Sequence, residues 1–395
     1  MTTPDSGSNS GMDAETFEQF IDQLQRYVRD RLIPAEREII ETDSIPEDIV
    51  GEMRDMGLFG LTVPEEFGGA GLNVSQYART VHTLSYAMPA FRSLVSINIG
   101  MFCSAIKNGG TDAQKAEWLP RIAAGEITCF GLTEPGAGSD SAGMQTMAVK
   151  TDNGWVLNGT KRYITNAPFA KVALVMARTS KENQPKNAHV SAFIVPMDAS
   201  GVSVGKSDKK MGQAGSQIAD IILEDVHVSD DALLGGELGK GFVFAMKSLD
   251  NGRISVGSAA TAYARRALDS AVRYATERKA FGEPIANFQL VQQMLAQSEI
   301  EIYAAETMMA DVTRRADAGE NVLRKAAAFK VFASEMCGRV VDNCVQVYGG
   351  AGYLAEYDAE RFFRDARIYR IYEGTTQILQ LQIAKHMLRE FHASA

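Results

Sequence analysis

The chain has 395 residues, of which 45% are apolar and 23% are charged, and this composition excludes bulk disorder and a collagen-like fibre. At roughly 100–200 residues per domain, the length predicts two or three domains with a large buried core. The formal net charge is −9 and the densest basic spot is only the pair Lys209 and Lys210, so nucleic acid is excluded as an expected partner because a phosphate-backbone binder needs a basic face.

The cysteines and histidines show no pattern of a disulfide framework or a metal site. The cysteines are Cys103, Cys129, Cys337 and Cys344, without Cys-x-x-Cys spacing, so we expect reduced thiols and a cytoplasmic protein. The five histidines form no His-x-x-x-His pair, and we expect no metal. Residues 1–12 lack the apolar segment of a signal peptide and are expected to form a disordered tail. No uncharged apolar run approaches the ~18 residues of a membrane span.

Residues 13–126 are expected to form an N-terminal helical domain. Apolar side chains from Phe17 to Leu32 follow the i, i+3, i+4, i+7 spacing of one helix face. Pro34 comes next, in a position typical of a helix end. Residues 76–87 and 112–123 show similar patterns and predict further helices.

Residues 127–235 are expected to form a compact β domain. Residues 155–157 and 162–164 flank Asn158-Gly159, which predicts a hairpin with a tight turn. Further β-rich runs span 171–177, 190–195 and 218–228, and turn residues separate them.

Residues 236–395 are expected to form a C-terminal helical bundle, with helices over 238–391. Ten of the eleven prolines lie at or before Pro196, and the last is Pro284. Because proline breaks helix interiors, the long stretch after Pro284 can carry long helices. Apolar residues from Phe288 to Ile302 recur near helical spacing.

Two motifs suggest chemistry that their context does not support. Residues 201–205 read Gly-x-Ser-x-Gly, but a nucleophile elbow needs a strand before it and a helix after it, and this segment lies inside the β region. Residues 350–355 resemble a loose dinucleotide fingerprint, which requires a βαβ context, whereas this segment follows a helical stretch. We expect neither a hydrolase nor a nicotinamide site.

The glycine-rich segment LTEPGAGSD at 132–140 opens the β domain. Its glycines permit close backbone approach, and its hydroxyl and N–H groups can bind a polar ring edge or a phosphate. By itself the segment is equally compatible with an ordinary glycine-rich loop.

A second candidate segment spans residues 364–378. Gly374 interrupts a helical pattern, and Thr375 or Thr376 can cap a new helix that runs through His386. Glu373 therefore lies in a break just before a helix N-terminus, where N–H groups can bind a ligand oxygen. By itself Glu373 is either a surface acid that complements the helix dipole or a catalytic base.

Four motifs in this order resemble those of the acyl-CoA dehydrogenase family. They are LTEPGAGSD at 132–140, NGTKRYITN at 158–166, RKAFG at 278–282 with Phe288 and Gln289, and QVYGGAGY at 346–353 with YEGT at 372–375. The resemblance covers about residues 15–395. It implies an α+β multidomain fold with an N-terminal α-helical domain, a middle β-barrel domain and a C-terminal α-helical bundle. It also implies FAD and a homo-oligomer, usually a homotetramer.

The resemblance implies that the enzyme converts an acyl-CoA to a trans-2-enoyl-CoA. The α proton leaves to a base and the β hydrogen leaves as hydride to the flavin. The YEGT motif places the base at Glu373. In part of the family the base lies on an earlier helix, where this chain has Gly252, which cannot act. The Glu373 backbone N–H and a flavin hydroxyl would bind the enolate-like oxygen, and an electron-transferring flavoprotein would receive the electrons in fatty acid metabolism.

The resemblance also carries flavin contacts onto residues of two domains. In the middle domain they are Phe130, Leu132, Thr133, Ser139, Tyr163, Ile164 and Thr165. From neighbouring subunits they are Arg278, Phe281, Gln289, Gln346, Gly349 and Gly350, with Thr375 and Gln377 near the adenine half. Tyr163 departs from the family pattern, in which tryptophan precedes Ile-Thr, so a phenol ring replaces an indole at the flavin face.

Substrate contacts that the resemblance carries over are Ser139, Asp250, Arg253 and Gly374. Arg92 and Ser96 lie on a segment that resembles the wall of the acyl pocket. In the glutaryl-CoA branch, an Arg and a Ser at this spacing face the distal carboxylate of the substrate. Two interpretations of Arg92 stay open: it binds such a carboxylate, or it is structural and pairs with a nearby acid.

Three classes of function compete. An acyl-CoA dehydrogenase is favoured, with a dicarboxylyl-CoA (glutaryl-like) dehydrogenase as its alternative. The second class is a flavoenzyme of the same fold with other chemistry, such as an oxidase, a decarboxylating dehydrogenase or a desulfinase. The third is a non-catalytic acyl-CoA-binding protein, which is expected to lack the base, whereas Glu373 is present.

Overall fold

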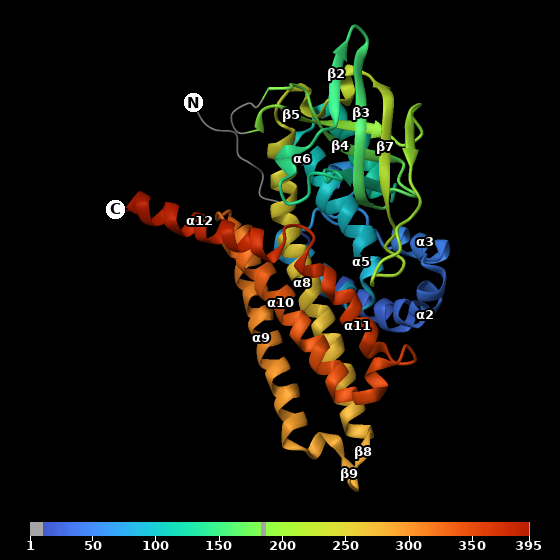
Figure 1. The fold of residues 1–395 in the computed structure, drawn as a ribbon, viewed down its shortest axis with the longest axis vertical. Coiled ribbons are helices and arrows are strands. Elements are labelled where there is room, and N and C mark those ends of the chain that lie inside the picture. The colour runs from blue at the N-terminus through green and yellow to red at the C-terminus, as the bar shows by residue number, and fades with distance from the viewer. Residues whose placement is uncertain (1–10, 183–186, 395) are drawn as a thin grey trace.

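The structure is a computed structural model that describes residues 11–182 and 187–394. Helices of the N-terminal part, a central sheet and a long C-terminal helical bundle follow one another along the chain (Figure 1). This arrangement confirms the three-part organisation expected from the sequence. Residues 1–10 of the expected tail lie outside the described residues. Met12 is tied down, because its N–H donates to Gln76 Oε1 at 3.0 Å.

The N-terminal helices bury apolar residues in two cores. The helices are α1 Ala14–Tyr27, α2 Ile33–Thr42, α3 Glu47–Asp55, α4 Val74–Leu84, α5 Pro89–Ser96, α6 Ser104–Gly109 and α7 Asp112–Ala123. Helices α1 to α5 pack with the C-terminal helices, and α6 and α7 pack with strands of the middle domain. The predicted helices at 76–87 and 112–123 correspond to α4 and α7. The predicted stripe is buried at Phe17, Ile21 and Leu24 of α1.

The helix does not end at Pro34, which corrects that expectation. A π-helical turn, Val28–Leu32, joins α1 directly to α2, and Pro34 lies in the first turn of α2. Proline removes one N–H from a helix, and here it directly follows the π-helical turn, whose last hydrogen bond runs from the Ile33 N–H to the Val28 carbonyl oxygen five residues back.

A continuous helical stretch, Pro89–Gly109, is apolar and long enough to cross a membrane by length and composition. Of its most apolar window, 89% is buried inside the protein. It comprises α5, the π-helical segment Ile97–Cys103 and α6. Its apolar character therefore matches that of a core helix.

The middle domain is built on a seven-stranded sheet. The strands are β1 Thr128–Gly131, β2 Met147–Thr151, β3 Gly154–Thr165, β4 Val172–Arg178, β5 Val190–Pro196, β6 Val202–Val204 and β7 Ile218–Val228. Neighbours follow the order β1-β4-β2-β3-β7-β6, and β5 pairs with β4. Residues 201–205 hold β6 rather than a nucleophile elbow, as expected.

The predicted hairpin turn at Asn158-Gly159 is wrong. Both residues lie inside β3, and the hairpin connection instead joins Thr151 of β2 to Gly154 of β3. Gly159 is at φ +152°, and a Cβ there would lie 2.4 Å from Thr146 Oγ1. This glycine therefore permits a close approach of two segments and an irregularity in the pairing with β7.

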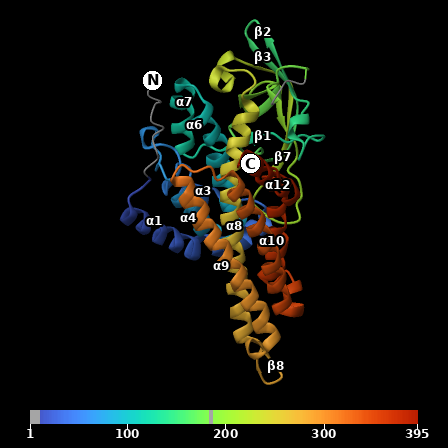
Figure 2. The same ribbon diagram turned by 90° about the vertical axis from the view of Figure 1, so that its left-hand side faces the viewer.

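The C-terminal domain contains three long helices that run side by side to a two-stranded tip (Figures 1 and 2). Its elements are α8 Gly241–Glu277, β8 Lys279–Ala280, β9 Glu283–Pro284, α9 Gln289–Asp317, α10 Leu323–Tyr348, α11 Asp358–Ala366 and α12 Thr376–Ser394. The bundle confirms the prediction from proline placement. Gly349–Tyr353 is a short 3-10 turn after α10, so the βαβ context of a nicotinamide fingerprint is missing there.

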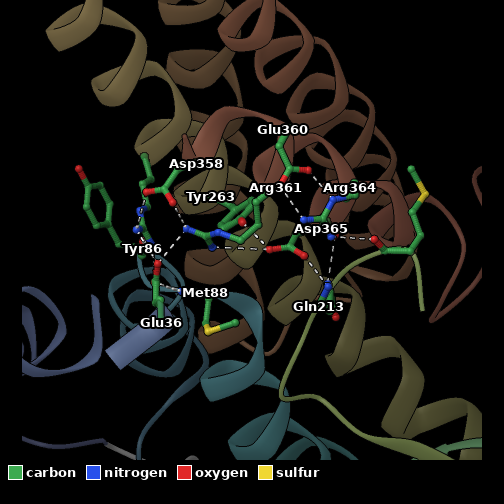
Figure 3. Close-up of polar contacts among 12 residues, drawn as sticks. Glu36, Tyr86, Met88, Gln213, Tyr263, Asp358, Glu360, Arg361, Arg364 and Asp365 are labelled. Carbon is green, nitrogen blue, oxygen red and sulfur yellow. Dashed lines mark hydrogen bonds and ion pairs between the residues drawn. The ribbon is translucent and has the colours of Figure 1, made fainter. Parts of the chain in front are cut away.

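A buried polar junction joins the three domains (Figure 3). Glu36 of α2 accepts hydrogen bonds from Arg266 of α8 at 2.7 Å and from Arg361 of α11 at 2.9 Å. Asp365 of α11 accepts the backbone N–H of Gln213, in the loop before β7. Because breaking a buried ion pair is strongly destabilising, this junction fixes how the domains meet around the site described next.

Candidate active site

Glu373 lies in a left-handed turn between α11 and α12. Its φ is +52°, and that of Gly374 is +97°. A Cβ at Gly374 would lie 2.9 Å from Leu379 Cδ2, so this position requires glycine for both backbone and space. Thr375 Oγ1 accepts the Ile378 N–H at 3.3 Å, which confirms the predicted cap; α12 then extends beyond His386 to Ser394.

The Glu373 carboxyl group lies directly against the backbone of α8. A Cβ on Gly252 would lie 1.8 Å from Glu373 Oε2. The two base positions considered from the sequence are thus neighbours in space, and Gly252 leaves the room that the Glu373 carboxyl group occupies.

Burial controls the protonation of Glu373. Oε2 is buried and has no hydrogen-bond partner among the described residues. Burial raises the pKa of Glu373, and the positive charges of Arg92, Lys330 and Arg253 partly oppose that rise. A desolvated carboxyl group of this kind is suited to accept a proton from a weak carbon acid.

Arg92 is buried as well, and its charge interacts with that of Glu373. Its Nη2 donates to Ser255 Oγ at 3.0 Å and its Nη1 to the Tyr372 hydroxyl at 3.4 Å. Nε has no partner, and Arg92 makes no ion pair with an acid within the described part of the chain. The charge of Glu373 nevertheless acts on Arg92, so both interpretations of Arg92 stay open.

The middle-domain segments predicted to contact flavin lie next to one another. Thr133 C=O accepts the Arg162 N–H at 2.8 Å, which joins the start of the glycine-rich loop to β3. Tyr163 is at φ +58° and its residue is 56% exposed, and the Arg162 guanidinium lies over its ring at 4.9 Å from the centroid. Leu132 and Ile164 are buried beneath this surface, and Ser139 is exposed.

Sequence reasoning missed the ion pair that joins these segments. Lys161 Nζ and Glu134 Oε1 are 2.7 Å apart and nearly inaccessible to solvent. The Glu134 carboxylate also accepts the N–H groups of Gln145 and Thr146. One carboxylate therefore holds both ends of the glycine-rich loop and β3 together. The sequence signal for this ion pair is the alternation of side chains along β3, which places Lys161 on the buried face of the strand.

The C-terminal flavin contacts fall into two places. At the start of α12, Gln377 is exposed and Thr375 is half-buried beside the Glu373 turn. The others are exposed and lie far from the middle-domain set: Arg278, Phe281, Gln289, Gln346, Gly349 and Gly350. Tyr274 of α8 stacks on Tyr348 of α10 with ring centroids 4.0 Å apart, so the contacts after both helices lie at the same end of the bundle. That end is opposite the β domain (Figures 1 and 2).

Among the predicted substrate contacts, Gly374 and Arg253 lie at the Glu373 turn. Arg253 is buried on α8, one residue after Gly252. Asp250 is on α8 as well, but its side chain lies outside the described part.

Charged groups from α5, α8 and α10 face the Glu373 carboxyl group, and exposed rings and glycines lie on two other surfaces. Family models for the acyl-CoA dehydrogenase N-terminal, middle and C-terminal domains match residues 14–126, 129–226 and 239–388. The chain belongs to the acyl-CoA dehydrogenase family, whose members are FAD-dependent oxidoreductases.

Relatives match over nearly the whole chain. Short-chain specific acyl-CoA dehydrogenase of Homo sapiens is 38% identical over 96% of this chain and 92% of its own length. The CarC subunit of the caffeyl-CoA reductase-Etf complex of Acetobacterium woodii is 37% identical over 89% of this chain and 93% of its own length.

Solved structures show the same fold. Butyryl-CoA dehydrogenase from Megasphaera elsdenii has a TM-score of 0.90 and 33% identity, covering 95% of this chain and 100% of that one. A glutaryl-CoA dehydrogenase from Mycobacterium smegmatis in complex with FADH2 has a TM-score of 0.88 and 29% identity, covering 97% of this chain and 96% of that one.

The residues present fit FAD. The Tyr163 ring is exposed, and no atom lies within 4 Å of a Cβ built on Gly349 or Gly350, so backbone can approach a cofactor there. Thr133 and Thr165 supply hydroxyls beside the ring, and Arg278 supplies a guanidinium suited to a pyrophosphate.

Proposed function

We propose that this enzyme converts an acyl-CoA to the trans-2-enoyl-CoA, with Glu373 as the general base. The supporting observation is the buried, unpartnered Glu373 carboxyl group against Gly252. The α C–H of a thioester is a weak acid, so its base must be poorly solvated and have a raised pKa. Burial raises the pKa of Glu373 in this direction.

Glu373 has two roles in this reaction, one through its carboxyl group and one through its backbone N–H. Glu373 takes the α proton while its own backbone N–H, which donates no other hydrogen bond among the described residues, is available to the thioester oxygen as negative charge develops. FAD, when bound, accepts the β hydrogen as hydride. Burial of Glu373 raises its pKa and so favours proton uptake by the carboxyl group.

The test is anaerobic reduction of the FAD-loaded enzyme by a panel of straight, branched and dicarboxylic acyl-CoAs. We expect at least one to bleach the flavin and to yield the trans-2-enoyl-CoA. Peroxide formation at the same rate in air would instead indicate an oxidase, and loss of CO2 or sulfite would indicate a decarboxylating dehydrogenase or a desulfinase. No bleaching by any acyl-CoA would contradict the proposal.

Arg92 favours a second candidate within this function, an acyl group with a distal carboxylate. A buried guanidinium is costly without a counter-charge. Its Nε has no partner, and among acids in the described chain only Glu373 raises its pKa. A dicarboxylyl-CoA would supply such an anion, and one relative of this chain, from Mycobacterium smegmatis, is named a glutaryl-CoA dehydrogenase.

We further propose an electron-transferring flavoprotein as electron acceptor, supported by the relative that is a subunit of an Etf complex. The four cysteines are free and buried, which supports a reducing, cytoplasmic location. We also propose a role in fatty acid metabolism at that location.

The FAD site is proposed to form between subunits of a homo-oligomer, in the family usually a tetramer. The flavin contacts at 278–289 and 346–350 lie at the opposite end of one protomer from those of the middle domain (Figure 1), and Phe281 at the bundle tip is 97% exposed. We expect light scattering to show an oligomer, and Phe281→Asp to dissociate it and release a flavin that chromatography identifies as FAD. The control Val149→Asp changes an apolar residue on the β2 hairpin that is 54% exposed and should leave assembly intact. A monomer that binds FAD tightly would contradict this prediction.

A further inference from the structure

Helix α10 holds the Glu373 turn from both sides. Lys330 Nζ donates to the Gly374 carbonyl oxygen at 2.7 Å. Five residues later, Glu335 Oε1 accepts the Thr376 hydroxyl at 2.7 Å and Oε2 accepts from Arg370 at 3.3 Å. Residues before and after Glu373 are therefore attached to one rigid helix.

The turn needs such support because its backbone is unusual. Glu373 has a positive φ of +52° without being glycine. Left-handed backbone at a non-glycine residue is strained and persists only where surrounding contacts determine it. The bond from Lys330 acts on the residue directly after Glu373 and so fixes the direction of its side chain.

Lys330 places a positive charge on the buried, apolar face of α10. Its residue is 0% exposed, and Ala326, Phe329 and Ala333 are buried around it. A lysine in such a position is costly unless a carboxylate compensates its charge. Burial lowers the pKa of Lys330 to about 8, and the carboxylates of Glu373 and Glu335 oppose that shift.

Charged groups face Glu373 from three helices. They are Arg92 on α5, Arg253 on α8 and Lys330 on α10, and Tyr372 precedes Glu373 on its own segment. Arg92 reaches the Tyr372 hydroxyl at 3.4 Å, whereas Lys330 bonds to the backbone of the turn at the Gly374 carbonyl oxygen. Lys330 therefore couples the backbone position of the turn to a positive charge beside the carboxyl group.

We propose that Lys330 is a positioning residue that holds the Glu373 turn through Gly374 and that sets, through its positive charge, the lowest pH at which Glu373 acts as the base. This inference rests on the proposed role of Glu373. A nearby cation stabilises the carboxylate form, so removing it must move the onset of activity to higher pH.

The experiment measures anaerobic flavin reduction against pH, using the acyl-CoA that reduces the FAD-loaded enzyme fastest. Wild type is compared with Lys330→Met, Lys330→Gln and Lys330→Arg. Lys330→Met and Lys330→Gln remove the charge, and the acid limb of the profile should rise by roughly one pH unit. Lys330→Arg keeps the charge and should leave the limb near its wild-type position.

Two controls separate charge from turn geometry. Lys325→Met removes a lysine of the same helix that is 45% exposed and should change nothing. Glu335→Ala loosens the turn but retains the Lys330 charge, so it should lower the rate at every pH without raising the limb. FAD content and melting temperature are recorded for every variant.

The outcomes distinguish this inference from the proposed function. If neither Lys330→Gln nor Lys330→Met moves the acid limb, or if Lys330→Arg moves it as far as they do, Lys330 is merely structural. If Lys330→Met fails to fold, the comparison of Lys330→Gln with Lys330→Arg decides the question. If Glu373→Gln retains its rate in the same assay, the base has been misassigned and the proposed function fails first.

Discussion

Glu373→Gln is expected to abolish reduction of the flavin by acyl-CoA while the protein still folds and binds FAD. The amide has nearly the shape of the carboxyl group but cannot accept the α proton. A general base contributes roughly 10²–10⁴-fold to rate, and Glu373 Oε2 is buried without a hydrogen-bond partner among the described residues. The measurement is the anaerobic rate of flavin bleaching at a pH above the acid limb.

The matched control is Glu356→Gln, an exposed acid in the loop before α11, which should keep the wild-type rate. Gly252→Ala gives a second test from the opposite side. Its Cβ would take the place of Glu373 Oε2, so the flexible carboxyl group must move while the fold remains. A displacement of about 1 Å can cost 10²-fold in rate. A Glu373→Gln enzyme that retains half of the wild-type rate would show that another residue is the base.

The Glu373 turn could be predicted because its determinants are local. A glycine after the glutamate and a threonine cap two residues on define a helix break from the sequence alone. The same local reasoning failed at Asn158-Gly159, because Gly159 serves a contact with Thr146 in another segment. It failed at Pro34, because a π-helical turn keeps the helix continuous.

Lys330 and the Lys161–Glu134 pair were not predicted because their partners are distant in sequence. Gly374 lies 44 residues from Lys330, and Glu134 lies 27 residues from Lys161. The sequence does contain a signal: Lys330 falls at helical spacing between Ala326 and Ala333, on the apolar face of α10. A lysine on such a face predicts a buried carboxylate or carbonyl partner, but spacing cannot say which one.

The placement of the flavin contacts required the fold as well. Motif order associates residues near 163 with residues near 281 and 349, but only the structure shows that one protomer holds them at opposite ends. A site shared between subunits is therefore a conclusion from three-dimensional distance.

Arg92→Ala is expected to reduce kcat/KM for glutaryl-CoA by roughly 10²-fold or more, because losing one partner of a buried ion pair costs about 3–5 kcal/mol. Butyryl-CoA has no distal carboxylate, so its turnover should stay nearly unchanged. Since Arg92 also lowers the pKa of Glu373, both substrates must be compared at a pH where Glu373 is ionised in both proteins. A loss of kcat/KM for glutaryl-CoA that butyryl-CoA does not share would show that Arg92 binds the distal carboxylate.

A structural Arg92 would give a different pattern. Its contacts to Ser255 and Tyr372 join α5 to α8 and to the Glu373 turn, so their loss would affect every substrate and lower the melting temperature. Arg92→Lys sharpens the distinction: it keeps the charge but loses bidentate geometry, so glutaryl-CoA activity should recover only in part. Equal losses for glutaryl-CoA and butyryl-CoA, together with a lowered melting temperature, would eliminate the carboxylate-binding role and leave a plain alkyl acyl-CoA as the substrate class.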